Sequence, residues 1–285
     1  MDQSVPSRVK QALNDSIQNS SLNFEVINTG TTSYSPTIFY ILARYVLTDY
    51  DPDLIVVNVD MTDDFDDWKY QETLLKDADG NPRAAPPRDI YAAEYIDTAT
   101  GPVASDLAIK LELFLFQNSY TYNLIRTKFV TEPTPAQLET PATDLYPRWA
   151  WNYKEWDART ERNVENTLDI LDRLAKFTNR NDIKLMITAV PHYEQFAGHA
   201  DGTGEPAFSA RPHYQIERVA RANDVPYLNS FEALRPAITG TAQAKYYYRG
   251  DMHFNPAGYG LWAEAHLKFL LDPIHDLLPA EICED

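Results

Sequence analysis

The stretch GDMHFNPAGYG at 250–260 holds two residue types that can do acid–base chemistry, because Asp251 and His253 are separated by a single residue. A histidine serves as general base for a hydroxyl nucleophile when a carboxylate holds its other ring nitrogen in the right tautomer. The spacing therefore suggests the Asp–His half of a hydrolytic site. A surface turn with an incidental histidine is the alternative, since such pairs also arise by chance.

Residues nearer the middle of the chain are weaker candidates for contact with a substrate. His192 follows a strand-like run that ends in Ala-Val-Pro, and ligand sites of α/β proteins gather at the carboxyl ends of strands. Trp149 and Trp151 follow a proline-rich stretch, with Trp156 close behind, and such rings suit stacking on sugars. Loop packing of the histidine and core packing of the tryptophans are the alternatives.

An acidic run contains Asp63, Asp64, Asp66 and Asp67. Clustered carboxylates can bind a hard cation such as calcium, but this run lacks the glycine and glutamate pattern of an EF-hand loop. We therefore expect a solvated acidic face and no metal site.

Composition limits the classes of partner. The chain has 285 residues, 44% of them hydrophobic and 24% charged, which is typical of a globular protein. Its net charge of -17 opposes binding to nucleic acid or to an anionic membrane surface. The single cysteine, Cys283, excludes an internal disulfide and a cysteine-based zinc site.

The sequence gives little information on the compartment. No stretch approaches the roughly 20 apolar residues of a membrane-spanning helix. The first residues, which include Asp2, Pro6 and Lys10, do not resemble a signal peptide. An exported or periplasmic location stays open, because a signal or an anchor can precede Met1.

The elements that must position these residues alternate along the chain. The runs FEVIN (24–28) and DLIVVNV (53–59) are typical of strands buried in a parallel sheet, and apolar residues recur at helical spacing between them. Further helices and strands are predicted over 164–175, over 183–190, around Ile216 and Val219, and in VPYLN. A last helix begins near Pro256, where Asn255 can act as N-cap.

Two excursions interrupt this alternation, at about 64–104 and 130–160, and a helix is expected between them over 105–128. Both excursions contain proline-rich segments. Loops of this length often serve as lids or binding walls, although a structural insertion is an equal alternative. We therefore expect one domain spanning residues 1–285.

The motifs resemble those of the SGNH (GDSL-like) hydrolase superfamily. DMHFNPAGYGLWAEA is similar to its last block, in the D-x-H spacing of a subset of members, and EVINTGTTSYSP is similar to its second block. MTDDFDD occupies the position of the third block. The resemblance implies that His253 is the base, that Asp251 orients it, and that Gly30 N–H and Thr62 form the oxyanion hole.

The chain departs from the family pattern in two places. Thr62 stands where the family has an asparagine, and a hydroxyl still donates one hydrogen bond. The first block, which carries the nucleophilic serine after a strand, is absent because SVPSRVKQALND already reads as the first helix. The resemblance therefore implies a serine and a strand upstream of Met1. Ser4, Ser33 and Ser35 are the alternatives within the chain.

Together these observations predict an α/β fold. We expect a three-layer α/β/α sandwich with a flavodoxin-like, mostly parallel sheet that lacks its first strand, which is interior in the order 2-1-3-4-5. The resemblance implies an ester hydrolase that acts on an O-acylated carbohydrate or a similar small ester without a cofactor. An O-acyltransferase and a non-catalytic carbohydrate-binding relative are the alternatives, and the oligomeric state stays open.

Overall fold

The computed structural model describes residues 4–16, 23–31, 33–71, 73–85, 146–196, 208–249, 251–279 and 282. In these segments the central sheet has the strand order β1–β4–β5 with every neighbouring pair parallel. β1 spans Leu54–Asp60, β4 spans Lys184–Val190 and β5 spans Tyr227–Leu228. The strands predicted at 53–59, at 183–190 and in VPYLN are thus confirmed.

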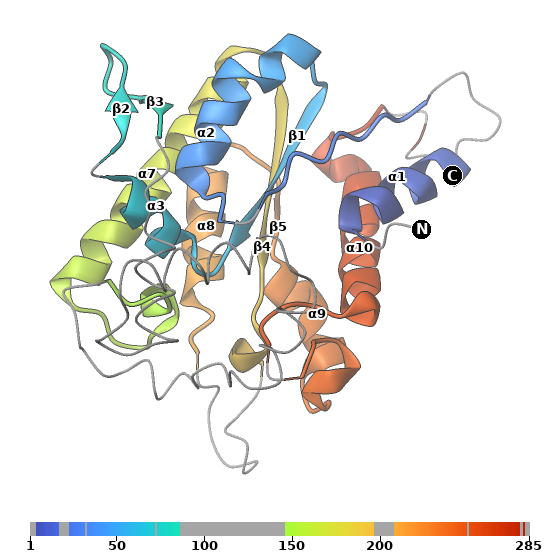
Figure 1. The fold of residues 1–285 in the computed structure, drawn as a ribbon. Helices are drawn as coiled ribbons and strands as arrows, with labels where there is room; N and C mark the ends of the chain where they lie inside the picture. The colour runs from blue at the N-terminus through green and yellow to red at the C-terminus, as the bar shows by residue number, and fades with distance from the viewer. Residues whose placement is uncertain are drawn as a thin grey trace, which may run out of the picture.

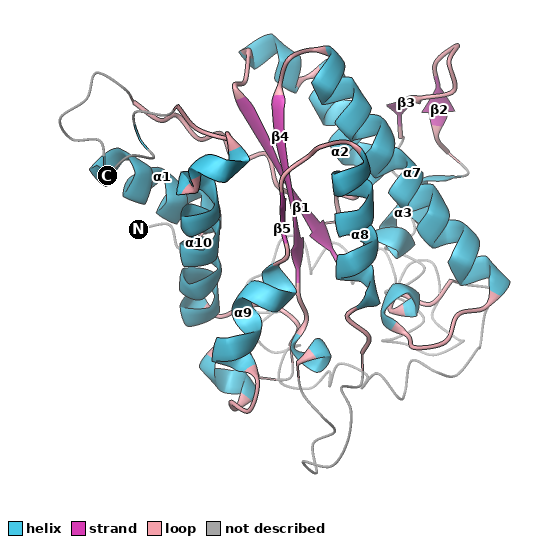
Figure 2. Ribbon diagram, turned by 180° about the vertical axis from the view of Figure 1, so that it is seen from behind, coloured by secondary structure: helices cyan, strands magenta, loops and turns pink. Residues whose placement is uncertain are grey.

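Helices cover both faces of this sheet (Figure 1). One layer contains α2 (Pro36–Tyr45), α3 (Asp63–Gln71), α7 (Ala158–Arg180) and α8 (Arg211–Ala222). The other contains α1 (Val5–Ser16), α9 (Ser230–Ile238) and α10 (Pro256–Leu271), as the view from behind also shows (Figure 2). The fold is therefore the predicted three-layer α/β/α arrangement.

Each face of the sheet contributes to its own core. On β1, Ile55, Val57 and Val59 are buried against α2 and α7, because alternate side chains of a strand point to opposite faces. β4 is buried on both faces: Ile187 joins this core, whereas Met186 packs with α1, α9 and α10. A central strand buried on both sides explains the uninterrupted apolar run at 185–187.

The short elements complete the described chain. The hairpin of β2 (Leu75–Lys76) and β3 (Pro82–Ala84) is antiparallel and stands apart from the central sheet. The 3₁₀ helices are η1 (Leu47–Tyr50), η4 (Ala150–Asn152), η5 (Tyr193–Gln195), η6 (Gln243–Lys245) and η7 (Pro273–His275). No helix in the described segments is both long enough and apolar enough to cross a membrane.

One predicted strand is not found. Residues 23–31, which include FEVIN, belong to no strand, and Ile27 is 52% exposed. The physical reason is the lack of a neighbouring strand in the described chain, because an extended backbone counts as a strand only when it is paired. The helix expected over 105–128 lies outside the described residues, as do residues 86–104 and 130–145 of the two excursions.

Candidate active site

The Asp251–His253 pair lies on the loop that leads into α10. An isolated antiparallel bridge joins Tyr247 to Phe254, and Tyr248 N donates to His253 O at 3.0 Å. Tyr247 also donates its hydroxyl to Pro191 O at 2.8 Å, just beyond the end of β4. These bonds hold the loop at the carboxyl edge of the sheet.

The sequence FNPAG positions this loop against the helix that follows. Asn255 Oδ1 accepts from Ala257 N at 2.9 Å and from Gly258 N at 3.0 Å, which confirms the predicted N-cap. A side chain at Gly258 would place its Cβ 2.0 Å from Tyr246 O, so only glycine allows the loop and the helix to approach this closely.

Asp251 and His253 form the contact that a general base requires. His253 Nδ1 lies 2.6 Å from Asp251 Oδ1, and the same oxygen accepts from His253 N at 3.0 Å. With Nδ1 donating to the carboxylate, Nε2 carries the lone pair and can accept a proton. The His253 side chain is 60% exposed, and no described residue bonds to Nε2.

A second Asp–His pair lies at the same edge. Asp60 ends β1 and pairs in register with Val190 at the end of β4, so His192 follows only two residues later. His192 Nε2 is 3.4 Å from Asp60 Oδ2. The His192 ring is 1% exposed and meets the Trp149 ring edge-on at 5.2 Å. Its Nδ1 is buried, so this histidine offers no accessible lone pair to a nucleophile.

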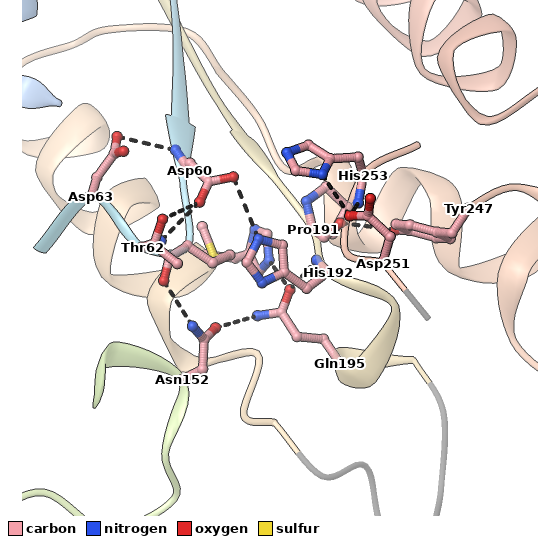
Figure 3. Close-up of polar contacts among 12 residues, drawn as sticks. Asp60, Thr62, Asp63, Asn152, Pro191, His192, Gln195, Tyr247, Asp251 and His253 are labelled. Atoms are coloured by element: carbon pink, nitrogen blue, oxygen red, sulfur yellow. Dashed lines mark hydrogen bonds and ion pairs between the residues drawn. The ribbon is translucent and has the colours of Figure 1, made fainter. Parts of the chain in front are cut away.

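Asp60 is held in its charged form. Burial alone would raise its pKa, but the charge of His192 and hydrogen bonds from His192 and Thr62 outweigh burial and lower the pKa well below its usual range. Its side chain remains 35% exposed. Figure 3 shows the His253 ring projecting from its loop toward the side on which Asp60 lies.

Tyr259 connects the two pairs electrostatically. Burial raises the pKa of Tyr259, and the nearby Tyr248, Asp251 and Asp60 raise it further. Geometry agrees, because the Tyr247 hydroxyl, at the start of the His253 loop, donates to Pro191 O directly before His192. The two Asp–His pairs therefore belong to one region of the molecule.

Both predicted oxyanion donors are engaged within the chain. Thr62 donates to Asp60 Oδ1 through its amide at 2.9 Å and through its hydroxyl at 2.7 Å. Gly30 N donates to Asn28 Oδ1 at 3.0 Å in an exposed segment. Either group must exchange its present bond before it can serve an oxyanion. Their roles therefore stay predictions.

A buried amide network, which the sequence did not reveal, supports His192 from below (Figure 3). Gln195 Oε1 accepts from His192 N at 2.9 Å and from His213 Nε2 at 3.0 Å. Gln195 Nε2 lies 3.3 Å from Asn152 Oδ1, and Asn152 donates to Met61 O at 2.7 Å. Burial, with a smaller effect of His192, lowers the pKa of His213 to about 3, so its ring is neutral and donates through Nε2.

The tryptophans divide between core and site. Trp151 is 0% exposed and donates to Gln215 Oε1 at 3.0 Å, so its predicted role in substrate binding was wrong. Trp156 is half-buried, and Arg211 lies 3.5 Å from its ring centroid. Trp149 is also half-buried and contacts His192, so among these residues it alone combines exposure with a place at the site.

The acidic run forms the first half of α3 and is not a solvated face. Asp63, Asp64, Asp66 and Asp67 are all buried, so this prediction was wrong. Burial raises the pKa of each, and hydrogen bonds from neighbours such as Tyr146, whose hydroxyl is 2.6 Å from Asp64 Oδ2, replace water. In the described chain no group of three or more His, Cys, Asp or Glu residues is arranged to hold a metal ion.

The alternative serines do not complete the site. Ser35 is fully buried and its hydroxyl donates to Asp67 Oδ1 at 2.6 Å. Ser33 lies in the left-handed region with a φ of 61°, and Ser4 Oγ bonds to Ser7 Oγ at 3.2 Å. No described serine bonds to His253.

Comparisons with known proteins find a likeness among solved structures. No protein-family model matches the chain, and no curated protein matches it. Among solved structures, the chain is similar to a mutant of an acetyl-xylooligosaccharide esterase from Geobacillus Stearmophilus. The identity is 10%, the match covers 94% of this chain and 80% of that chain, and the TM-score is 0.49.

Proposed function

We propose that this chain carries the base and the orienting carboxylate of an SGNH-type ester hydrolase, whose substrate is an O-acylated carbohydrate or a similar small ester. The observation that carries the proposal is the Asp251–His253 contact of 2.6 Å beside an exposed ring whose Nε2 bonds to no described residue. A base in this state needs only a hydroxyl and an ester in front of it.

The nucleophile in this proposal is a serine outside these 285 residues. His253 Nε2 takes the serine proton as the serine oxygen attacks the acyl carbon, and Asp251 stabilises the imidazolium that forms. His253 then returns the proton to the departing alcohol oxygen. Water repeats the same steps on the acyl-enzyme and releases the acid. Gly30 N–H and Thr62 stabilise the two oxyanions once their bonds to Asn28 and Asp60 are exchanged.

Two features beside His253 favour a sugar as the alcohol part of the ester. Asp60 presents an ionised, partly exposed carboxylate, which accepts hydrogen bonds from hydroxyls. Trp149 adds a half-buried aromatic ring next to His192. Hydroxyl acceptors combined with an aromatic surface suit a carbohydrate better than a long acyl chain.

A second candidate function is carbohydrate binding without catalysis. The internal bonds of Thr62 and Gly30 favour it, because an oxyanion hole normally presents free donors. In that case Asp60 and Trp149 keep their roles, whereas His253 has none in turnover.

The test uses the protein extended by the residues encoded immediately upstream. We expect the extended protein to cleave an aryl acetate and an acetylated monosaccharide, and the 285-residue chain to show negligible turnover. His253→Ala in the extended protein should abolish turnover without unfolding it. His275→Ala, which removes a ring of η7 that stacks on Phe269, is the matched control and should remain active.

Each of the other possible outcomes would support a different function for the chain. Sugar binding without turnover in the extended protein would support the binding relative. Acyl transfer to a second sugar in place of water would identify a transferase. Full activity of the 285-residue chain would show that its nucleophile lies within these residues, and Ser4, Ser33 and Ser35 would be the ones to substitute. Activity retained in His253→Ala would contradict the proposal outright.

A further inference from the structure

Two buried amide side chains connect the carboxyl ends of β1 and β4. Asn152 Nδ2 donates to Met61 O at 2.7 Å, directly beyond the end of β1. Gln195 Oε1 accepts from His192 N at 2.9 Å, shortly beyond the end of β4. The two amides meet where Gln195 Nε2 donates to Asn152 Oδ1 at 3.3 Å (Figure 3). We call these hydrogen bonds, from His192 N to Met61 O, the amide bridge.

The two ends of the amide bridge fix the direction of every hydrogen bond in it. A backbone N–H can only donate, and a backbone C=O can only accept. The N–H of His192 therefore requires the oxygen of Gln195, which leaves Gln195 Nε2 to donate to Asn152. The C=O of Met61 likewise requires the nitrogen of Asn152, which leaves Asn152 Oδ1 to accept. The two requirements agree, so neither amide can be flipped without bringing like groups together.

Burial and further hydrogen bonds hold Asn152 in place. Asn152 is 0% exposed, and Gln195 is 1% exposed. The backbone N of Asn152 donates to Trp149 O at 2.9 Å, and its backbone O accepts from Ser209 N at 2.8 Å. Gln195 Nε2 also donates to Ser209 O at 3.0 Å. A buried polar network whose members are all bonded is rigid, so Asn152 is a fixed point beside the candidate site.

The bond from Asn152 to Met61 O sets the direction of the Thr62 N–H. In a trans peptide the C=O of one residue and the N–H of the next point in opposite directions, and no peptide bond in the described segments is cis. Because Met61 O points toward Asn152, the Thr62 N–H points away from Asn152 and meets Asp60 Oδ1 at 2.9 Å. Figure 3 shows Asn152 on one side of Thr62 and Asp60 on the other.

The two donors of Thr62 are held in different ways. Asp60 Oδ1 accepts both the N–H, at 2.9 Å, and the hydroxyl, at 2.7 Å. The side chain of Asp60 is 35% exposed, so it has room to turn when a substrate enters. The hydroxyl then loses the group that directs it, because it turns about the Cα–Cβ bond. The N–H keeps its direction, because the buried Asn152 holds the other end of the same peptide.

We propose that Asn152 is a positioning residue that keeps the Thr62 N–H directed at the oxyanion, and that this N–H is the Thr62 group that stabilises it. A donor that is already oriented stabilises developing charge without reorganisation at the moment of reaction. The assignment of an oxyanion to Thr62 rests on the proposed function. The hold of Asn152 on the Met61–Thr62 peptide does not, and it can be measured in the 285-residue chain without turnover.

Asn152→Ala removes the bond to Met61 O and frees the peptide to rotate. In NMR spectra of the 285-residue chain, the Thr62 N–H should exchange with solvent about 10-fold faster or more. The nuclear Overhauser effect between Met61 Hα and the Thr62 N–H should also change, because it reports rotation of this peptide plane. Exchange of Ile187 N, which donates to Pro226 O at 3.1 Å within the sheet, corrects for any change in global stability.

Asn223→Ala is the matched control. Asn223 is 9% exposed, and its Nδ2 donates to Asp172 Oδ1 and to Val219 O, both at 2.9 Å, away from the candidate site. This variant also removes a buried amide and should lower the urea midpoint of unfolding. A residue that only stabilises the fold changes all exchange rates together, so the Thr62 signals should change no more than those of Ile187.

Asn152→Asp tests the direction of the hydrogen bond with a side chain of the same shape. Burial raises the pKa of the introduced carboxyl group, and in its neutral form its O–H can donate to Met61 O. The ionised form has no donor. The Thr62 signals should therefore match the wild type at low pH and those of Asn152→Ala at high pH. The wild type, titrated in parallel, accounts for His192, His213 and Asp60, the titratable groups that face the amide bridge.

The catalytic consequence is measured in the form of the protein that carries the nucleophile. Asn152→Ala should lower kcat by about 10²-fold, a typical cost of misplacing a group of the site, and KM should change little. Thr62→Val removes the hydroxyl and keeps the N–H, so its loss of kcat should be smaller. A loss in Thr62→Val as large as that in Asn152→Ala would identify the hydroxyl as the donor and overturn the assignment to the N–H.

Unchanged Thr62 signals in a folded Asn152→Ala chain would overturn the proposal. If this variant does not fold, the wild type decides, through the coupling across the hydrogen bond between Asn152 Nδ2 and the carbonyl carbon of Met61. A wild type without this coupling would overturn the proposal, and its presence together with the Asn152→Asp titration supports it. Changed Thr62 signals in a protein without turnover would leave the hold of Asn152 intact and contradict the proposed function alone.

Discussion

At the scale of single residues, the two histidines at the carboxyl edge differ in which nitrogen is accessible. Both contact an aspartate, but His253 bonds through Nδ1 and leaves Nε2 in an exposed position. His192 bonds through Nε2 and leaves Nδ1 buried. Only the first arrangement lets a hydroxyl deliver its proton. His192 instead holds Asp60 charged, and Asp60 is the residue that faces solvent.

Replacing Asp251 by asparagine should test the orienting role of the carboxylate. The amide of the new side chain would be able to donate to His253 Nδ1, which favours the tautomer with the proton on Nε2 and removes the base. In the form of the protein that carries the nucleophile, we expect Asp251→Asn to lower kcat by about 10⁴-fold, the effect seen for the equivalent change in a serine protease triad. KM should change little.

The matched control is Asp276→Asn, whose side chain is 89% exposed and pairs with Lys184 away from the site. It should keep full activity. A loss of less than about tenfold in Asp251→Asn would show that Asp251 does not orient the base.

At the scale of elements, the packing of the His253 loop against α10 depends on the close approach of Gly258 to Tyr246 and Phe254. A Cβ at Gly258 would lie 2.0 Å from Tyr246 O and 2.5 Å from the Phe254 ring, and neither can move without opening the loop. At Gly260, in the same part of α10, a Cβ would meet the flexible end of Arg8 at 3.3 Å. The two glycines therefore form a matched pair.

Gly258→Ala should lower the free energy of unfolding by roughly 2 to 4 kcal/mol, the usual range for overpacking and strain in a core. Gly260→Ala should change it by less than about 1 kcal/mol, because alanine favours the helix where glycine does not. Urea unfolding at constant slope measures both. Equal effects of the two substitutions would show that the close approach at Gly258 does not hold the loop.

The elements also show what the sequence could predict. The strand β4 was predictable because its own apolar, β-branched residues indicate a buried strand. The start of α10 was predictable because Asn255 and Pro256 are residue types that favour a helix N-terminus. FEVIN carries the same local signal but has no strand beside it in the described chain, and pairing is a property of two segments. The prediction that the acidic run of α3 is a solvated face failed because the burial of these aspartates depends on neighbours such as Tyr146, which lies far away in sequence.

The candidate site was predictable to a similar degree. Asp251 and His253 are neighbours in sequence, so their contact follows from a local turn. The contact between Asp60 and His192 joins two strands and required the register of β1 with β4. Asn152 and Gln195 gave no sequence signal, because amide side chains occur in any loop.

At the scale of the whole molecule, buried ionisable groups oppose each other in their response to pH. Burial lowers the pKa of His213 to about 3 and that of His266 to about 4, so both disfavour folding as the pH falls below the unfolded value of about 6.5. The buried aspartates of α3 have raised pKa values, so their contribution is lost as the pH rises. Between about pH 4 and about pH 6.5 the histidines and the aspartates therefore change the free energy of unfolding in opposite directions, and their effects partly cancel.

Asp64→Asn should separate the two effects. Folded Asp64 keeps a proton that the unfolded chain releases above about pH 4, so wild-type stability falls with rising pH through this group. The variant has no such titration. Its free energy of unfolding should therefore rise relative to that of the wild type by roughly 1.4 kcal/mol per pH unit above about pH 4, until the pH passes the pKa of folded Asp64. Its amide oxygen still accepts from Tyr146.

Urea unfolding from about pH 5 to about pH 8 measures the difference between the two proteins. Asp49→Asn, at an exposed position in η1, is the matched control for the loss of one negative charge. A constant difference between Asp64→Asn and wild type across this range would mean that Asp64 is ionised in the folded protein.

The side chain of Asn255 couples the motion of the His253 loop to the opening of the first turn of α10. Its oxygen caps α10, while its nitrogen donates to Ala244 O at 3.0 Å and to Tyr247 O at 3.2 Å in the loop before the helix. One amide thus makes the loop and the first turn of α10 a single cooperative unit, which opens and closes together. An exposed histidine on a surface loop would ordinarily sample many positions within nanoseconds. Here its backbone is released only when the helix start frays.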